Sequence, residues 1–269
     1  MTAARMRWHG QLAFTLLVCA FLIVPVVLSV LAGLSQNFFV GIASGFTLRW
    51  VAQVWSLYRD SIYLSLGIAL ACLAATLMLG VPAAYALARR PSRWTRLFEE
   101  ILVLPVAVPG LATALALILF YGEWRAFRTS WVFILVGHVL FTLPFMVRSV
   151  AAVMAATNLT ALEEAAASLG AGFAARFFGV IVPNARAGIL AGALMVVTLS
   201  IGEFNITWML HTPLTKTIPV GLADSYASMR LELGSAYTII FFLMIVPLLV
   251  AMQWLSAERA TVWRAIGDE

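Results

Sequence analysis

Two ionisable side chains lie within long apolar stretches of this sequence, where a charge is costly. Glu203 and His138 are each surrounded by apolar residues. A charge at membrane depth costs roughly 2.5–3.5 kcal/mol on insertion scales, so such residues face a bundle interior or water. Two interpretations of Glu203 stay open: a gate or interhelical hydrogen bond, or a lining of a solute pathway together with Asn205 and Thr207. For His138, a packed or hydrogen-bonded role is favoured over that of a catalytic base.

The other chemically informative segment is the long loop over residues 155–187. Thr160 with Glu163 three residues later has the pattern of a capping box, which predicts a helix that begins after Thr160. Gly170 is well placed to end this helix, because glycine accepts the left-handed conformation that follows many helices. A second helical stretch follows, which we expect to stop at Pro183.

The first helix of this loop carries a narrow face of small and apolar residues. Leu162, Ala166 and Leu169 recur at the spacing that places them on one side of a helix. Such a face suits close approach by another surface. Physical reasoning leaves two interpretations about equally open: a helical hairpin folded on its own bundle, or a docking helix for a soluble partner.

Composition decides which solvent these elements face. Of 269 residues, 63% are hydrophobic and only 11% are charged, where a soluble domain has about 25% charged residues. A soluble fold of this length could not bury so much apolar surface, so we expect the chain to lie in lipid. The net charge of +5 is spread over short loops, which argues against a nucleic-acid partner. Two cysteines and three histidines match no metal-ligand spacing, and no cofactor is expected.

Six apolar segments are long enough to cross a membrane as helices, which predicts an all-α polytopic membrane protein. A helix needs about 20 apolar residues to span the hydrocarbon. The expected spans are Leu12–Leu34, Ser61–Ala88, Ile101–Tyr121, Trp131–Met154, Gly188–Leu210 and Ala236–Leu255.

The distribution of arginine and lysine predicts that both termini are cytoplasmic. With the N-terminus inside, eleven of the 17 basic residues lie on the inner side, counting Arg148 in the inner part of the fourth span, and outer segments hold six. Basic residues favour the cytoplasmic side of a membrane. We therefore expect a cytoplasmic N-terminus (residues 1–11), a transmembrane domain (12–256) that includes the cytoplasmic 155–187 loop, and a cytoplasmic C-terminus (257–269).

The loop also carries a pattern at fixed spacing. Glu164-Ala165-Ala166, three residues, Gly170, nine residues and Val180-x-Val182-Pro183 resemble the EAA loop of permease subunits of bacterial binding-protein-dependent ABC importers. Val180 and Val182 replace the family's isoleucine and leucine. The resemblance implies that this loop forms a coupling helix in a groove of the ATP-hydrolysing subunit. The residues that it assigns to ATPase coupling are Glu163, Glu164, Ala165, Ala166, Leu169, Gly170 and Pro183.

The same resemblance implies a set of partners in the cell inner membrane. These are two ABC ATPase subunits, a second permease that is identical or homologous, a periplasmic solute-binding protein and the surrounding lipid. No G-x-x-x-x-G-K-[ST] pattern occurs, so we expect ATP to be hydrolysed on the separate subunit and this chain not to be an enzyme.

The solute is less well determined by the sequence. Gly202-Glu203-Phe204 and the segment over residues 215–222 resemble permeases for polyamines, 2-aminoalkylphosphonates, sulfate and molybdate. A polyamine or an aminoalkylphosphonate is favoured, with sulfate, molybdate or ferric iron as alternatives. A secondary transporter is a more distant alternative, and it would need internal repeats and sites for ion coupling.

Overall fold

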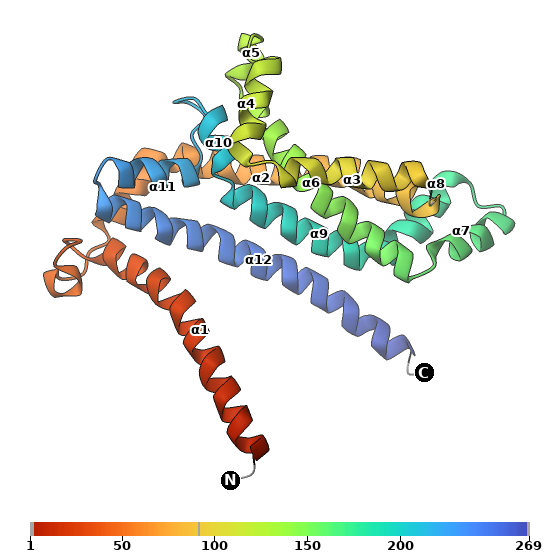
Figure 1. The fold of residues 1–269 in the computed structure, drawn as a ribbon, viewed down its shortest axis with the longest axis horizontal. Coiled ribbons are helices and arrows are strands. Elements are labelled where there is room, and N and C mark those ends of the chain that lie inside the picture. The colour runs from red at the N-terminus through yellow and green to blue at the C-terminus, as the bar shows by residue number, and fades with distance from the viewer. Residues whose placement is uncertain (1–2, 91, 268–269) are drawn as a thin grey trace. The chain divides into compact units, whose positions relative to one another are not determined.

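The computed structural model describes residues 3–90 and 92–267, with side chains over residues 7–90 and 92–254. Residues 1–2, 91 and 268–269, which belong to the two expected termini and to the loop after the second span, lie outside the described residues. Figure 1 labels the α-helices. The helical elements are α1 (Ala3–Leu34), η1 (Gly41–Ser44), α2 (Arg49–Arg89), α3 (Arg93–Ala107), α4 (Gly110–Tyr121), α5 (Arg125–Arg128), α6 (Trp131–Ala156), α7 (Leu159–Ser168), α8 (Phe173–Arg176), η2 (Phe177–Ile181), α9 (Val182–Gly202), α10 (Asn205–Leu210), α11 (Ile218–Ala227) and α12 (Leu231–Gly267).

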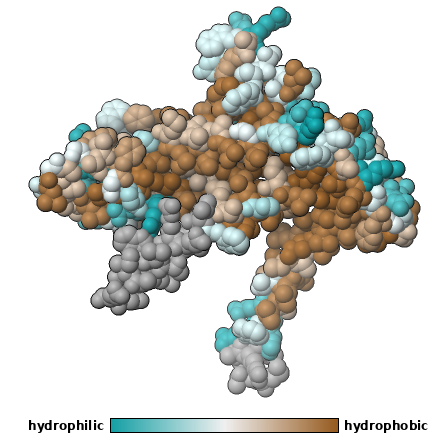
Figure 2. All heavy atoms as spheres, turned by 180° about the vertical axis from the view of Figure 1, so that it is seen from behind, coloured by the Kyte–Doolittle hydropathy of each residue, from teal (hydrophilic) through white to brown (hydrophobic). Residues whose placement is uncertain are grey.

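The all-α prediction is confirmed for the described part of the chain, where the only β-type pairing is an isolated bridge between Ser35 and Phe46. Five of the described helices are long and apolar enough to cross a membrane, and the number is six if a bent pair of helices counts as one span. Hydrophobic side chains cover most of the long helices on the face in Figure 2, whereas hydrophilic side chains gather near helix ends. This pattern is that of a polytopic membrane protein.

The third expected span is a broken helix. α3 and α4 are bent by 102° relative to each other, and Figure 1 shows α4 standing away from α3. Val108, between them, is extended, with φ −83° and ψ 135°. The cause is Pro109, because a proline disfavours the helical conformation of the residue before it.

The fifth expected span also differs from the prediction of one helix over residues 188–210. α9 ends at Gly202, and the short α10 begins at Asn205 after a two-residue break. At its other end, the candidate span begins at Phe173, well before the expected start. The break places Glu203, which has an extended backbone, between two helices and not within a continuous one.

The chain divides into two compact units, residues 1–59 with 221–244, and residues 60–220 with 245–269. In the first unit, α1 crosses the beginning of α12 at close range. A Cβ atom added at Gly33 would lie 2.7 Å from the backbone carbon of Ser235. About one turn along the two helices, Ser29 Oγ donates a hydrogen bond of 3.4 Å to Thr238 Oγ1. Only glycine permits this backbone approach.

In the second unit, α6 and α9 pack along their length. A Cβ atom added at Gly188 would lie 2.6 Å from the carbonyl oxygen of Ser149, and one added at Gly192 would lie 2.8 Å from Met146 Sδ. Glycines four residues apart let two membrane helices approach closely. The pair therefore serves packing within this chain.

Candidate functional site

The 155–187 loop enters its first helix through a left-handed residue and not through a capping box. Asn158 has φ 46° and ψ 47° and precedes α7, which starts at Leu159. The prediction of Thr160 as the N-cap residue is therefore wrong, and no side chain caps α7. Asparagine tolerates the left-handed region better than most residues, and the Glu163 side chain is engaged elsewhere.

The end of α7 agrees with the prediction. Gly170 has φ 83°. The Gly170 amide donates to the Ala167 carbonyl at 2.9 Å, and the Ala171 amide donates to the Ala166 carbonyl at 3.1 Å. These two bonds are those of a Schellman motif, which satisfies the last carbonyls of a helix and needs a left-handed residue.

α7 has a buried side and an exposed side. Its only buried side chains are Leu159 and Glu163. Glu164 is exposed, and so are Leu162 at 44% and Leu169 at 90%. The predicted small and apolar face thus lies open in this chain. Of the two interpretations of the loop, this exposure fits the docking helix better than a hairpin buried on its own bundle.

Glu163 is the centre of a cluster that we call the Glu163 cluster, formed with Tyr85, Arg89 and Arg176. Tyr85 donates its hydroxyl proton to Glu163 Oε1 at 2.8 Å. Arg89 Nε lies 3.4 Å from Oε2, and Arg176 Nη1 lies 3.6 Å from Oε1. Tyr85 and Arg89 lie at the end of α2 and Arg176 on α8. The cluster therefore joins α7 to two other helices.

Beyond α7, the chain enters α9 without a stop at the predicted position. α8, η2 and α9 follow one another directly, and η2 is a π-helical turn over Phe177–Ile181. Pro183 lies in the first turn of α9. The helical run therefore continues from the π-helical turn through Pro183 and does not stop at it.

Glu203 lies at the break between α9 and α10 and is 8% exposed. Its Oε1 accepts from the Ile206 amide at 2.8 Å, and its Oε2 accepts from the Thr207 amide at 2.8 Å and from Thr207 Oγ1 at 2.9 Å. At the other end of α10, Arg128 Nη1 donates to the Leu210 carbonyl at 2.7 Å. A helix as short as α10 is unstable alone. The negative charge of Glu203 at its N-terminal end and the positive charge of Arg128 at its C-terminal end stabilise it.

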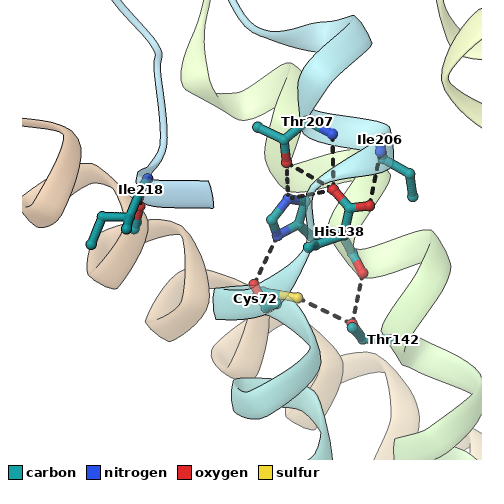
Figure 3. A network of polar contacts seen from close by, with 9 residues as sticks. Cys72, His138, Thr142, Ile206, Thr207 and Ile218 are labelled. Atoms are coloured by element: carbon teal, nitrogen blue, oxygen red, sulfur yellow. Dashed lines mark hydrogen bonds and ion pairs between the residues drawn. The ribbon is translucent and has the colours of Figure 1, made fainter. Parts of the chain in front are cut away.

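His138 connects this cap to α9 and α2 (Figure 3). Its Nε2 lies 2.8 Å from Thr207 Oγ1, and its Nδ1 lies 2.8 Å from Ser200 Oγ. Because Thr207 donates to Glu203, we assign the ring proton to Nε2, with Ser200 donating to Nδ1. The interpretation of His138 as a packed, hydrogen-bonded residue is confirmed.

The network continues from His138 towards α2. Thr142 Oγ1 donates to the His138 carbonyl at 2.7 Å and lies 3.2 Å from Cys72 Sγ, as Figure 3 shows. Cys72 and Thr142 are both fully buried. The polar groups here satisfy one another, so the geometry fits an interhelical hydrogen-bond network.

Residues 76–260 match the protein family described as the binding-protein-dependent transport system inner membrane component. The chain belongs to this family. It is a permease subunit of an ABC importer and a multi-pass protein of the inner membrane, and such permeases work with ATPase and solute-binding partners. ATP hydrolysis takes place on a separate subunit, and the permease itself is a transport protein rather than an enzyme.

Several curated permeases are similar over most of this chain. PhnV of Salmonella choleraesuis (strain SC-B67), named for 2-aminoethylphosphonate transport, is 26% identical and covers 93% of this chain and 92% of its own. CysW of Synechocystis sp., named for sulfate transport, is 28% identical over 74% of this chain and 77% of its own. PotI of Escherichia coli (strain K12), named for putrescine transport, is 28% identical over 82% of this chain and 80% of its own.

The permease structure separates the residues that the sequence grouped together. Glu163 turns inward, whereas Glu164 is exposed beside it. Glu203 and Thr207 meet in one buried network, and Asn205 is exposed outside it. The role of these three residues in a pathway or gate stays a prediction.

Sequence reasoning missed the partners of Glu163. Arg89 counted only as a cytoplasmic charge, and Tyr85 was not singled out. One signal was present, because Tyr85 and Arg89 are four residues apart and so lie on one helix face. Their long-range partner on α7 has no local signature.

Proposed function

We propose that the exposed side of α7 is the coupling surface through which two ATPase subunits drive this permease. The single observation that supports it is the division of α7 into two sides. Glu163 and Leu159 hold the helix from within, while Glu164, Leu162 and Leu169 stay accessible. A rigid helix with small, exposed residues and a firm attachment transmits force to the helices behind it.

We further propose that the permease pairs with a second permease, identical or homologous, and that a solute crosses between them after delivery by a periplasmic binding protein. Both termini and α7 then lie in the cytoplasm, as the distribution of basic residues predicts. The favoured solutes are an aminoalkylphosphonate or a polyamine. The names of PhnV and PotI support these two classes, and that of CysW supports sulfate as an alternative.

Charge reversal on the exposed side of α7 tests this assignment. Glu164→Arg should abolish solute uptake and release the ATPase subunit during purification, while the permease still inserts in the membrane at its normal level. Glu123→Arg is the matched control, because Glu123 is also exposed but lies between α4 and α5. Normal uptake by Glu164→Arg would show that the coupling surface lies elsewhere.

A further inference from the structure

Arg148 is a charged residue of α6 that belongs to neither of the networks above. It lies six residues before Met154, the end of the expected span, which is about 9 Å along a helix. Its side chain is exposed, and no hydrogen bond or ion pair is formed to it within the described part of the chain. An arginine at this depth is costly and marks a functional site by default.

A cavity of about 340 Å³ lies beside this arginine and is partly open to the surface of the chain. This volume is within the range of small-molecule sites, roughly 300–1,000 Å³. Besides Arg148, the lining includes Val103 and Val106 of α3, Phe145 and Ser149 of α6, and Met195 of α9. The walls are mainly apolar, and the charge in this lining comes from Arg148.

The guanidinium group selects among solute classes. Its planar fork of N–H donors matches the oxygens of phosphonates and sulfates, and its permanent charge repels a dication. A polyamine site would need free carboxylates. Glu203 is not free, since both its oxygens accept hydrogen bonds. Glu99 and Glu100 lie on α3 before Val103, nearer the expected cytoplasmic end, and are not part of the cavity lining.

We propose that Arg148 is the anion-binding residue of the solute pathway, and that this permease carries a solute with a phosphonate-type or sulfate-type oxyanion group. This inference rests on the proposed function, because it needs a pathway along the surface of α3, α6 and α9. It favours the solute classes named for PhnV and CysW over that named for PotI.

The first experiment measures the charge selectivity of the cavity and needs no knowledge of the solute. Val106→Cys is placed in the assembled importer, in a background in which Cys19 and Cys72 are changed to alanine. The probes are two water-soluble methanethiosulfonate reagents, one with an anionic sulfonate and one with a cationic trimethylammonium group. Leu214→Cys, at a residue that is 94% exposed in a loop, gives the intrinsic ratio of the two reaction rates.

With Arg148 present, the anionic reagent should be favoured at Val106→Cys relative to Leu214→Cys. Arg148→Gln should lower this preference about 10-fold, the lower end of the range for charge focusing in clefts, and Arg148→Lys should retain most of it. Equal ratios with Arg148 and with Arg148→Gln would overturn the proposal. Protection of Val106→Cys from both reagents would also overturn it, since a lipid phosphate or the second permease would then occupy the cavity.

The second experiment separates this inference from the proposed function. Cells with the whole importer are supplied with labelled 2-aminoethylphosphonate, sulfate or putrescine, with and without the ATPase subunit. ATPase-dependent uptake of an anion that Arg148→Gln reduces at least 10-fold, with the permease at its normal level, supports the inference. ATPase-dependent uptake of putrescine would refute the anion assignment and leave the proposed function intact. Uptake that needs no ATPase would refute the proposed function itself.

Discussion

The neighbouring residues Glu163 and Glu164 should have separable roles in α7. Glu163→Gln keeps the size of the side chain but removes the negative charge that faces Arg89 and Arg176. The Gln amide can still accept from the Tyr85 hydroxyl, yet its NH₂ group faces a cation. We therefore expect the attachment of α7 to weaken, while the exposed surface around Glu164 keeps its composition.

The size of the effect follows from the burial of the Glu163 cluster. Removal of one partner of a buried ion pair costs about 3–5 kcal/mol. The Glu163 side chain is 3% exposed, and those of Arg176 and Arg89 are 20% and 40% exposed. Because water partly solvates the two arginines, we expect about 3 kcal/mol, at the low end of that range. Tyr85→Phe removes the hydrogen bond to the Glu163 carboxylate and the one that Arg89 Nη1 donates to the Tyr85 hydroxyl at 2.9 Å. Because the exposed Arg89 can turn to water instead, we expect a cost of about 1.5 kcal/mol.

Backbone hydrogen exchange reports this loss directly. Glu163 and Leu159 are the only buried side chains of α7, so the opening of this helix should depend strongly on the cluster. A loss of 3 kcal/mol raises exchange about 100-fold, and a loss of 1.5 kcal/mol raises it about 10-fold. Amides of residues 159–168 should follow this order in the purified importer, with Glu164→Gln as the matched control at less than about twofold.

Uptake and ATPase measurements complete the comparison. Glu163→Gln should retain binding of the ATPase subunit and lose coupling. Glu164→Arg should lose binding, with unchanged exchange in α7 when both permeases are compared without the ATPase subunit. Unchanged exchange in Glu163→Gln would refute the reasoning, because the cluster would then contribute nothing to the attachment of the helix.

Two further predictions concern the buried network and the helix packing. Glu203→Gln turns one acceptor oxygen into a donor that faces the Thr207 amide, and it should reduce stability by about 1–3 kcal/mol. Thermal unfolding of the purified permease measures this loss, with Asn205→Ala at an exposed position as the control. If Glu203→Gln destabilises the permease no more than Asn205→Ala does, the capping role is contradicted. Gly188→Leu should prevent accumulation of folded permease in the membrane, because even a Cβ atom there would lie 2.6 Å from the Ser149 carbonyl oxygen. The control Gly67→Leu should accumulate normally, since a Cβ atom at Gly67 meets nothing within 4 Å. Equal accumulation of the two variants would contradict this packing.

The spans and the end of α7 could be predicted because both depend on local properties. Apolar length alone located six segments, and each corresponds to described helical structure. Gly170 could be assigned as the end of α7 because few residues other than glycine adopt φ 83° without strain. These features need no knowledge of what packs against them.

The errors occurred where tertiary contacts override local patterns. Thr160 and Glu163 have the spacing of a capping box, yet the Glu163 carboxylate binds Tyr85, more than 70 residues away in the sequence. Glu203 lies in an apolar stretch that suggests one long helix, yet its carboxylate caps a second helix. In both places a carboxylate binds partners that a local pattern does not reveal.

The same carboxylate that the local pattern misassigned gives α7 its mechanical connection. Tyr85 and Arg89 end α2, and Arg176 stands in α8, which leads through η2 into α9 without a loop. A displacement of α7 by the ATPase would therefore reach two membrane helices at once through Glu163. α9 packs on α6, the helix that carries Arg148. If coupling follows this route, Glu163→Gln should reduce ATP-dependent changes in reagent access at Val106→Cys, whereas the charge preference set by Arg148 should remain.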